Sequence, residues 1–206
     1  MIAVLFAEKT GIYSTFDNVD VWDIERDARN YAGPHPVVAH PPCTRWCRLA
    51  GLVEARWGHK RGDDGGCFAS ALASVRRWGG VLEHPAYSDA WKAYDLTPPK
   101  TGGGWQSADF VGGWTCYVEQ GRYGHVAKKA TWLYANGVTL PSLLWGHVAD
   151  RDVTATVSWC GNRTWKHSDR PRVGKKAASA TPIAFANVLV AMARSARGEM
   201  KACAND

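Results

Sequence analysis

Cys67-Phe-Ala-Ser-Ala-Leu-Ala-Ser-Val-Arg-Arg-Trp-Gly-Gly-Val-Leu-Glu83 contains a helix and a strand in immediate succession. Its first part spaces apolar residues at i, i+3, i+4 and i+7, which gives a helix one apolar face. That face consists of Phe68, Ala71, Leu72, Val75 and Trp78. Gly79-Gly80 ends the helix, and Val81-Leu-Glu83 has the short apolar character of a buried strand. A helix followed at once by such a strand indicates an α/β protein.

Other segments extend this alternation in both directions. Short apolar or alternating runs predict further strands at 1–6, 19–24, 36–39, 115–119 and 131–134. The polar stretch 25–31 predicts another helix, whereas the five glycines of 51–66 predict a mobile loop. Thr181 as N-cap and Pro182 as first helical residue predict a closing helix. Its apolar face would consist of Ile183, Phe185, Val188, Leu189 and Met192. We expect a single domain over 1–206, an α/β Rossmann-like sheet with helices on both faces.

The composition is that of a folded protein. Of the 206 residues, 46% are hydrophobic and 21% are charged, which argues against disorder and against a coiled coil. No apolar run reaches the ~20 residues that span a bilayer. The first residues, Met1–Phe6, lack the basic start of a secretory leader. We expect a soluble cytoplasmic protein that binds no membrane and needs no obligate protein partner.

The positive charge is concentrated near the C-terminus. Residues 1–159 contain 16 basic and 16 acidic residues, whereas 160–206 contain 9 and 3, so the formal net charge of +6 lies in the last segment. A neutral body with a basic end indicates an anionic partner, and nucleic acid is the first candidate. The alternative is a basic tail that only keeps the protein soluble.

Cysteines are most dense around His40-Pro-Pro-Cys43-Thr-Arg-Trp-Cys47. Without a secretory leader, the six cysteines are expected as reduced thiols. A zinc site built from His40, Cys43, Cys47 and Cys67 is an alternative. Because the Cys-x3-Cys spacing is loose and no second tight pair follows, we expect no metal site.

Three residues whose side chains could take part in a reaction follow predicted strands. Asp23, Cys43 and Glu83 each lie where a strand ends, and the sites of α/β sheets gather at the carboxyl ends of strands. Arg45 lies close to Cys43, so we expect a lowered thiol pKa and a nucleophilic role for Cys43. Glu83 suits proton donation to a ring nitrogen. The alternatives are an inert packing cysteine and a loop carboxylate paired with an arginine.

In this order, these segments resemble the cytosine-C5 DNA methyltransferases, most closely the short phage-encoded members with His-Pro-Pro-Cys. Val37–Cys43 resembles the catalytic Pro-Cys segment, and Val81-Leu-Glu-His-Pro85 resembles the segment with the catalytic glutamate. Val4–Ala7 and Val21–Glu25 resemble the first two strands, the second of which contacts the cofactor ribose. Further similarity covers 123–133, with paired basic residues, and the closing helix at 181–192.

The resemblance implies transfer of a methyl group from S-adenosylmethionine to C5 of cytosine in DNA. Cys43 would add to C6 of a base swung out of the duplex while Glu83 protonates N3, and 51–66 would close over the base. Lys128 and Lys129 would lie near the ring or the adjacent phosphates. The cofactor would be bound by Phe6, Gly11, Asp23, Glu25 and Pro41.

The expected DNA contacts lie mainly in 137–180, a reduced and basic recognition segment. With Arg45, Lys128 and Lys129, its contact residues would be Arg163, Lys166, Arg170, Arg172, Lys175 and Lys176. Basic residues next to tryptophans suit phosphate contacts and base stacking. Because so few residues can reach base edges, we expect relaxed sequence specificity.

Two alternatives stay open. The turn Glu8–Gly11 has one glycine where the family has several, so the chain could be a degenerate relative that binds nucleic acid or a nucleotide without methylating it. It could also modify a pyrimidine with a different one-carbon donor, again through Cys43.

Overall fold

The computed structural model describes residues 1–47, 50–157 and 170–196. In these ranges the chain forms one seven-stranded sheet. The strands are β1 (Ile2–Leu5), β2 (Val19–Trp22), β3 (Val37–Ala39), β4 (Gly80–Pro85), β5 (Gln106–Ser107), β6 (Trp114–Glu119) and β7 (Ala130–Asn136). The helices are α1 (Ala50–Trp57), α2 (Cys67–Trp78), α3 (Asp89–Ala93), α4 (Lys175–Ser179) and α5 (Ile183–Arg194). Single 3-10 turns are η1 (Ile12–Thr15), η2 (Ala28–Asn30), η3 (Gln120–Tyr123) and η4 (Asp150–Asp152).

The sheet is mixed, with the order β2-β1-β3-β4-β7-β6-β5. Strands β2, β1, β3 and β4 are parallel to one another. Strand β7 lies antiparallel between β4 and β6, so β4 and β6 point the same way. The chain order reverses between β1 and β3, since β2 lies on one side of this pair and β4 on the other.

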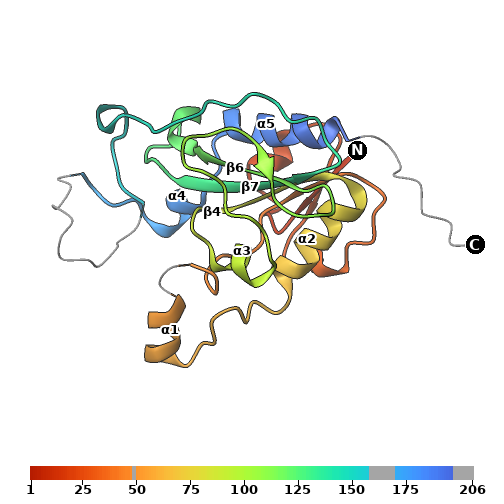
Figure 1. The fold of residues 1–206 in the computed structure, drawn as a ribbon, viewed down its shortest axis with the longest axis horizontal. Coiled ribbons are helices and arrows are strands. Elements are labelled where there is room, and N and C mark those ends of the chain that lie inside the picture. The colour runs from red at the N-terminus through yellow and green to blue at the C-terminus, as the bar shows by residue number, and fades with distance from the viewer. Residues whose placement is uncertain (48–49, 158–169, 197–206) are drawn as a thin grey trace, which may run out of the picture.

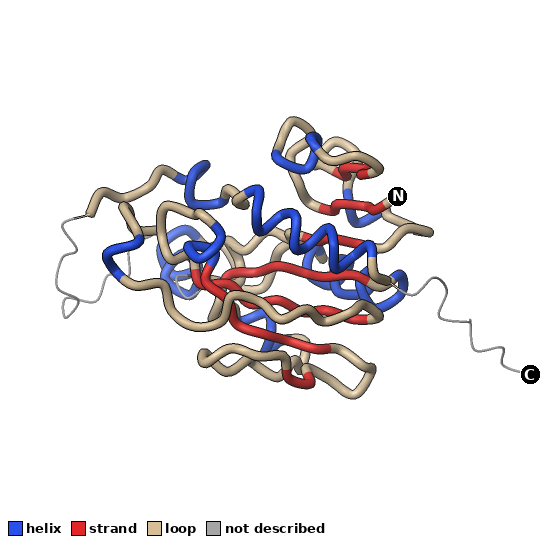
Figure 2. Tube along the Cα trace, turned by 90° about the horizontal axis from the view of Figure 1, so that it is seen from above, coloured by secondary structure: helices blue, strands red, loops and turns tan. Residues whose placement is uncertain are grey.

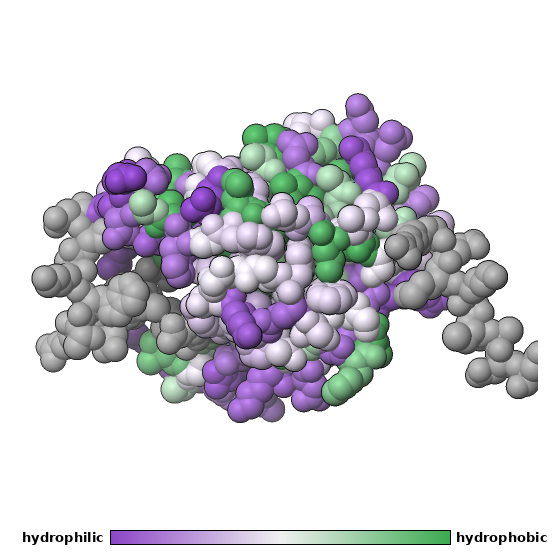
Figure 3. Space-filling view, turned by 45° about the horizontal axis from the view of Figure 1, so that its top comes forward, coloured by the Kyte–Doolittle hydropathy of each residue, from purple (hydrophilic) through white to green (hydrophobic). Residues whose placement is uncertain are grey.

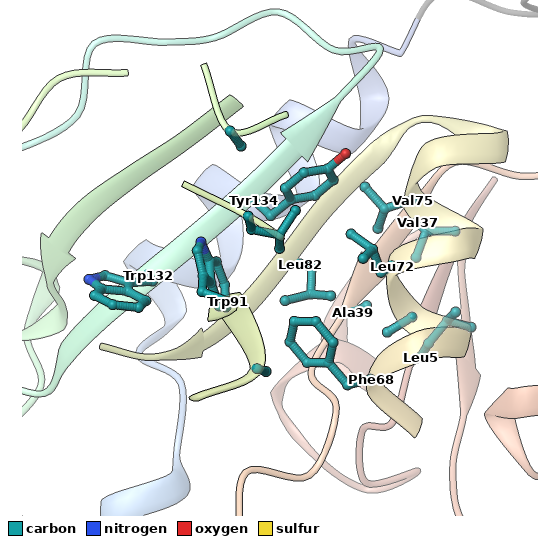
Figure 4. Close-up of a cluster of buried hydrophobic side chains, with 14 of the residues drawn as sticks. Leu5, Val37, Ala39, Phe68, Leu72, Val75, Leu82, Trp91, Trp132 and Tyr134 are labelled. Carbon is teal, nitrogen blue, oxygen red and sulfur yellow. The ribbon is translucent and has the colours of Figure 1, made fainter. Parts of the chain in front are cut away.

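One helix covers each face of the sheet (Figures 1 and 2). On the first face, Phe68, Leu72 and Val75 of α2 pack on side chains of β1, β3 and β4 (Figure 4). On the second face, Phe185 and Leu189 of α5 pack on the alternate residues of the same strands. These side chains are buried, so replacing Phe68 or Phe185 with alanine is expected to lower the free energy of unfolding by about 3–5 kcal/mol.

Close approach of β3 and β4 depends on a glycine. Gly80 has φ +139°, and a Cβ there would lie 1.9 Å from the carbonyl oxygen of Val37. Only glycine fits this backbone, so the Gly79-Gly80 pair both ends α2 and starts β4.

Most of the predicted strands and both strongly periodic helices are confirmed, as are the α/β class and the covering of both faces. Four expectations were wrong in detail. The stretch 25–31 holds only the short turn η2, because Asp23 and Asp27 accept backbone hydrogen bonds that favour turns. The stretch 51–66, expected as a loop, begins with α1. Helix α5 starts one residue late, with Pro182 and not Thr181 as its N-cap. Glu83 lies inside β4, not at its end, because pairing with β7 continues to Pro85.

Helix α1 lies apart from the sheet, at the bottom of Figure 1. Ala50 is its single buried residue, whereas Leu52 and Trp57 are exposed. On the face drawn in Figure 3, apolar side chains lie in separate spots among polar ones.

Among the described residues, one helical stretch, Lys175–Arg194, is long and apolar enough to cross a membrane by length and composition. Core helices of soluble proteins pass the same test. Since α5 supplies one whole layer of the core, packing against the sheet accounts for its apolar face.

Candidate functional site

The reversal of chain order between β1 and β3 marks where a ligand crevice is expected. In open α/β sheets, ligands bind beyond the carboxyl ends of strands at such a point. The chain leaves β1 at Phe6 and leaves β3 at His40-Pro-Pro-Cys43. Glu83 of the next parallel strand, β4, points to the same region, because its carboxylate contacts His40.

The Glu83 carboxylate is buried and bonded on both oxygens. Its Oε2 lies 3.0 Å from Nδ1 of His40, and its Oε1 accepts a 2.9 Å hydrogen bond from Nε2 of Gln120. Gln120 in turn donates to the hydroxyl of Thr131 at 3.0 Å. Burial alone would raise the pKa of Glu83, but the His40 hydrogen bond and the charge of Lys129 lower that pKa to about 2. Glu83 is therefore an ionised acceptor.

His40 links Glu83 to the segment that follows β1. Its Nε2 lies 2.7 Å from the hydroxyl of Tyr13, which belongs to η1 and is 3% exposed. Burial, followed by the charge of Glu83, raises the pKa of Tyr13, so this hydroxyl keeps its proton. The result is one hydrogen-bonded row, Tyr13–His40–Glu83–Gln120–Thr131.

Cys43 is partly buried beside this row. Burial raises the pKa of its thiol, and the negative charge of Glu83 raises it further. The expected lowering was therefore wrong, because burial and the carboxylate outweigh the positive charge that Lys129 supplies. Since the charge of Glu83 acts on the Cys43 thiol, the two side chains lie in the same region of the sheet edge.

Lys129 completes the group. Its Nζ donates hydrogen bonds to the carbonyl oxygens of Ser179 at 3.1 Å and Ala180 at 2.7 Å, which end α4. Burial lowers the pKa of Lys129, against the opposing charges of Glu83 and Cys43. The residue has φ +43°, a conformation that non-glycine residues rarely adopt. Lys129 thus brings one positive charge to the thiol and the carboxylate.

The five residues expected at the cofactor lie at the ends of three parallel strands. Phe6 follows β1 with φ +61°, and buried Pro41 follows β3. Gly11 precedes η1 with an ordinary φ of −80°, and a Cβ there would lie 2.9 Å from the Glu8 carbonyl oxygen. Asp23 follows β2, where its Oδ1 accepts hydrogen bonds from the backbone of Glu25 and Arg26. The Glu25 side chain is exposed.

Most of the basic residues expected to contact DNA lie within the described ranges, and two lie outside them. Arg45 is partly buried in the turn after Cys43, and Lys128 pairs with exposed Asp150 at 2.8 Å. Arg170 lies 3.8 Å from the same carboxylate. Arg172, Lys175 and Lys176 are exposed before and on α4. Arg163 and Lys166 lie outside the described residues, so the structure gives them no place.

A second histidine lies next to the site. His84 is fully buried, and no side chain among the described residues forms a hydrogen bond with its ring nitrogens. It packs between Phe68 and Trp91, with ring centroids 5.3 and 6.2 Å away. Burial lowers its pKa to about 4, against the opposing charge of Glu83. His84 is therefore neutral at physiological pH.

Neither of two pockets in the described part of the chain lies at Cys43 or Glu83, and that part of the chain contains no metal-binding cluster. Two pockets, of about 230 and 250 Å³, border α5, and neither is lined by Cys43 or Glu83. Within residues 1–47, 50–157 and 170–196, no group of three or more His, Cys, Asp or Glu side chains could hold a metal ion. His40, a member of the alternative zinc set, is instead bonded to Tyr13 and Glu83.

Sequence reasoning missed Tyr13, Gln120 and the role of His40. Tyr13 lies in η1, which follows β1 after the loop 6–11, and Gln120 begins η3 directly after β6. Both strands point toward the same edge as β3 and β4, so polar residues just after them were the available signal. No family model, no characterised protein and no solved structure matches this chain.

Proposed function

We propose that this protein is a DNA cytosine-C5 methyltransferase with a Rossmann-like catalytic sheet, in which Cys43 is the nucleophile and Glu83 acts on the ring nitrogen. One observation carries the proposal. The buried carboxylate of Glu83 lies 3.0 Å from His40 of the segment that carries Cys43, and the charges of Glu83 and Lys129 both act on the Cys43 thiol.

Each group has a part in this chemistry. Cys43, as thiolate, adds to C6 of the base, while a proton on Glu83 moves to N3 and makes C5 nucleophilic. After C5 has gained the methyl group, water takes the C5 proton, the thiolate is expelled from C6, and N3 returns its proton to Glu83. Lys129 offsets negative charge on Cys43 and Glu83 during these steps. Since a base in a duplex cannot reach Cys43, it must leave the stack.

The residues beyond β1 and β2 suit S-adenosylmethionine as methyl donor. The backbone N–H groups of residues 7–10 find no acceptor among the described residues, so they can bind a carboxylate. Asp23 and Glu25 offer carboxylate oxygens to ribose hydroxyls, and Phe6 and Pro41 offer apolar contacts. When bound, S-adenosylmethionine supplies an electrophilic methyl group.

The exposed basic residues around α4 support DNA as substrate. Lys129 donates hydrogen bonds to backbone carbonyl oxygens at the C-terminal end of α4. Lys175 and Lys176 therefore lie on a helix that adjoins the site (Figure 1). Such lysines contact phosphates regardless of base sequence. We therefore propose relaxed sequence specificity and a cytoplasmic location, where DNA and the donor are accessible.

Binding without transfer is the second candidate, because burial and Glu83 raise the pKa of Cys43 and so favour the unreactive thiol. Calorimetry with S-adenosylmethionine and with duplex DNA separates the two candidates. A methyltransferase binds both, whereas a degenerate relative binds DNA and not the donor.

Nucleoside mass spectrometry tests the proposed function. DNA from cells that express the protein should contain 5-methylcytosine, and DNA from cells with C43S should not. C47S, which changes a cysteine of the same loop, is the matched control and should resemble the wild type. The proposal is wrong if DNA from cells with the wild-type protein contains no more 5-methylcytosine than DNA from cells with C43S.

A further inference from the structure

The row Tyr13–His40–Glu83 gives His40 a role that the two catalytic residues do not cover. An ionised Glu83 cannot give a proton to a base until it has received one, and a hydrogen-bonded neighbour that can carry a proton can supply it. Of the described residues hydrogen-bonded to Glu83, which are His40 and Gln120, only His40 can gain and lose a proton. Its Nδ1 lies 3.0 Å from the carboxylate.

The hydrogen bonds also determine the tautomer of neutral His40. Because Glu83 is an acceptor, Nδ1 must carry the hydrogen and donate it. Nε2 then accepts from the hydroxyl of Tyr13 at 2.7 Å. Tyr13 comes from η1 and Glu83 from β4, so the ring is held between two separate elements of the fold.

We infer that His40 is a positioning residue that orients Glu83 and supplies the proton which Glu83 passes to the base, with Tyr13 holding the imidazole ring in place. The inference rests on the proposed function. Doubly protonated His40 gives its Nδ1 proton to Glu83, and Glu83 gives a proton to N3. Neutral His40 then keeps its Nε2 proton toward the Tyr13 oxygen. When N3 is deprotonated at the end of the reaction, the proton returns by the same path.

Four other charged or titratable groups surround Glu83 and affect its charge or are affected by it. Lys129, before β7, and His84, on β4, affect the charge of Glu83. Cys43, after β3, and Tyr13, on η1, are both influenced by that charge. Lys129 donates to the end of α4, and in the described part of the chain neither Lys129 nor His84 is hydrogen-bonded to Glu83. The direct path therefore runs through His40.

The pH dependence of single-turnover methylation tests proton supply. In the wild type, Cys43 must lose a proton while His40 must hold one. Because the step needs a thiolate and a bound proton together, the rate should rise with pH less steeply than the thiolate fraction of Cys43 and then level off. H40N keeps an N–H at the Nδ1 position but cannot release a proton. Its rate should be about 10²-fold lower near neutral pH and should continue to rise about tenfold per pH unit until Cys43 is ionised.

H35N, which changes a histidine with no hydrogen bond from its ring among the described residues, is the matched control and should keep the wild-type profile. A slower H40N enzyme that still levels off at the wild-type pH would overturn the inference, because His40 would then be merely structural.

A second measurement needs no activity. Nitrogen NMR of the labelled wild-type protein should show neutral His40 with its hydrogen on Nδ1, and Y13F should show a mixture of both tautomers. A hydrogen on Nε2 in the wild type overturns the positioning role. If the expected tautomer is present but the wild type leaves DNA unmodified, the proposed function and proton supply fail while positioning of Glu83 stands.

Discussion

Two buried glutamates, Glu83 on β4 and Glu119 on β6, lie on strands that point the same way, and each contacts Nδ1 of a histidine. For Glu83 the distance to His40 is 3.0 Å, and for Glu119 the distance to His147 is 2.7 Å. The surroundings differ. The His40 side chain is 13% exposed and bonded to Tyr13, whereas the His147 side chain is 62% exposed.

The other partners make the difference clearer. Glu119 also accepts from the hydroxyl of Tyr117 and from the backbone N–H of Val148, so it fastens the 147–148 loop to the sheet. Glu83 fastens no loop backbone among the described residues, but it influences Cys43 and Lys129. A histidine–glutamate pair is thus no mark of chemistry by itself, and the neighbouring thiol and ammonium distinguish the pair for which we propose a chemical role.

The largest expected effect separates these glutamates by rate. E83Q should lower the methylation rate by about 10²–10⁴-fold, because the base loses its proton donor. E119Q should leave that rate within about twofold of the wild type, since Glu119 is bonded to a loop and not to the catalytic groups. Both variants should lose about 1–3 kcal/mol of unfolding free energy, because each weakens a buried hydrogen-bond network. Single-turnover assays and urea unfolding measure the two effects, and equal loss of rate in both variants would remove the distinction.

Acid sensitivity gives the next effect. The pKa of Glu83 is about 2 when folded and about 4.3 when unfolded, so the folded state binds fewer protons between these values. Stability should therefore fall, on the order of 3 kcal/mol, as the pH drops from about 4.3 to about 2. E83Q should flatten this part of the curve of unfolding free energy against pH. An unchanged slope in E83Q would show that other groups cause the acid loss.

His84 predicts a separate window at higher pH. Its pKa is about 4 when folded and about 6.5 when unfolded, so the folded state again binds fewer protons in between. Stability should fall as the pH drops from about 6.5 to about 4, and H84L should remove that slope. The matched control is H35N, which should keep it. Urea unfolding across this range measures the effect, and a slope that persists in H84L would contradict the burial of a neutral histidine.

A smaller effect is expected on the reactivity of Cys43, because the charge of Lys129 acts at Glu83 and Cys43. K129M removes the positive charge that lowers the pKa of Cys43, so alkylation of Cys43 near neutral pH should slow by about tenfold. K128M removes the neighbouring charge, which pairs with exposed Asp150, and should leave the alkylation rate unchanged. Mass spectrometry of iodoacetamide-treated protein follows Cys43 separately from Cys47. Equal rates in K129M and the wild type would dissociate Lys129 from the thiol.

The smallest expected effect concerns DNA affinity. The double variant K175Q/K176Q should weaken DNA binding and reduce the slope of log affinity against log salt by about 0.9 for each phosphate that the protein no longer neutralises. K92Q/K100Q removes the same charge from exposed positions on α3 and the following loop and is the control. If both double variants bind alike, α4 does not contact DNA.

The sequence was sufficient where periodicity or short apolar runs determine an element. Helix α2 and the strands around it were predictable because Phe68, Leu72 and Val75 bury one face. The insertion of β7 between β4 and β6 was not, since strand order leaves no local pattern. Helix α1 was missed because it buries almost nothing and therefore has no apolar face.

At the site, the order of motifs pointed to Cys43 and Glu83. The direction of the Cys43 pKa was wrong, because sequence shows nearby arginines but neither burial nor a carboxylate about forty residues away along the chain. Tyr13 and Gln120 escaped notice for the same reason: their partners come from distant segments.

Covalent trapping tests the central claim most directly. Duplex DNA with 5-fluorocytosine in place of cytosine is incubated with the protein and S-adenosylmethionine. Fluorine on C5 cannot leave as a proton does, so the bond between the thiol and C6 persists. Mass spectrometry of peptides should find the base attached to Cys43, in the wild type and in C47S but not in C43S. A wild-type protein that binds both DNA and donor yet forms no adduct at Cys43 would contradict the account.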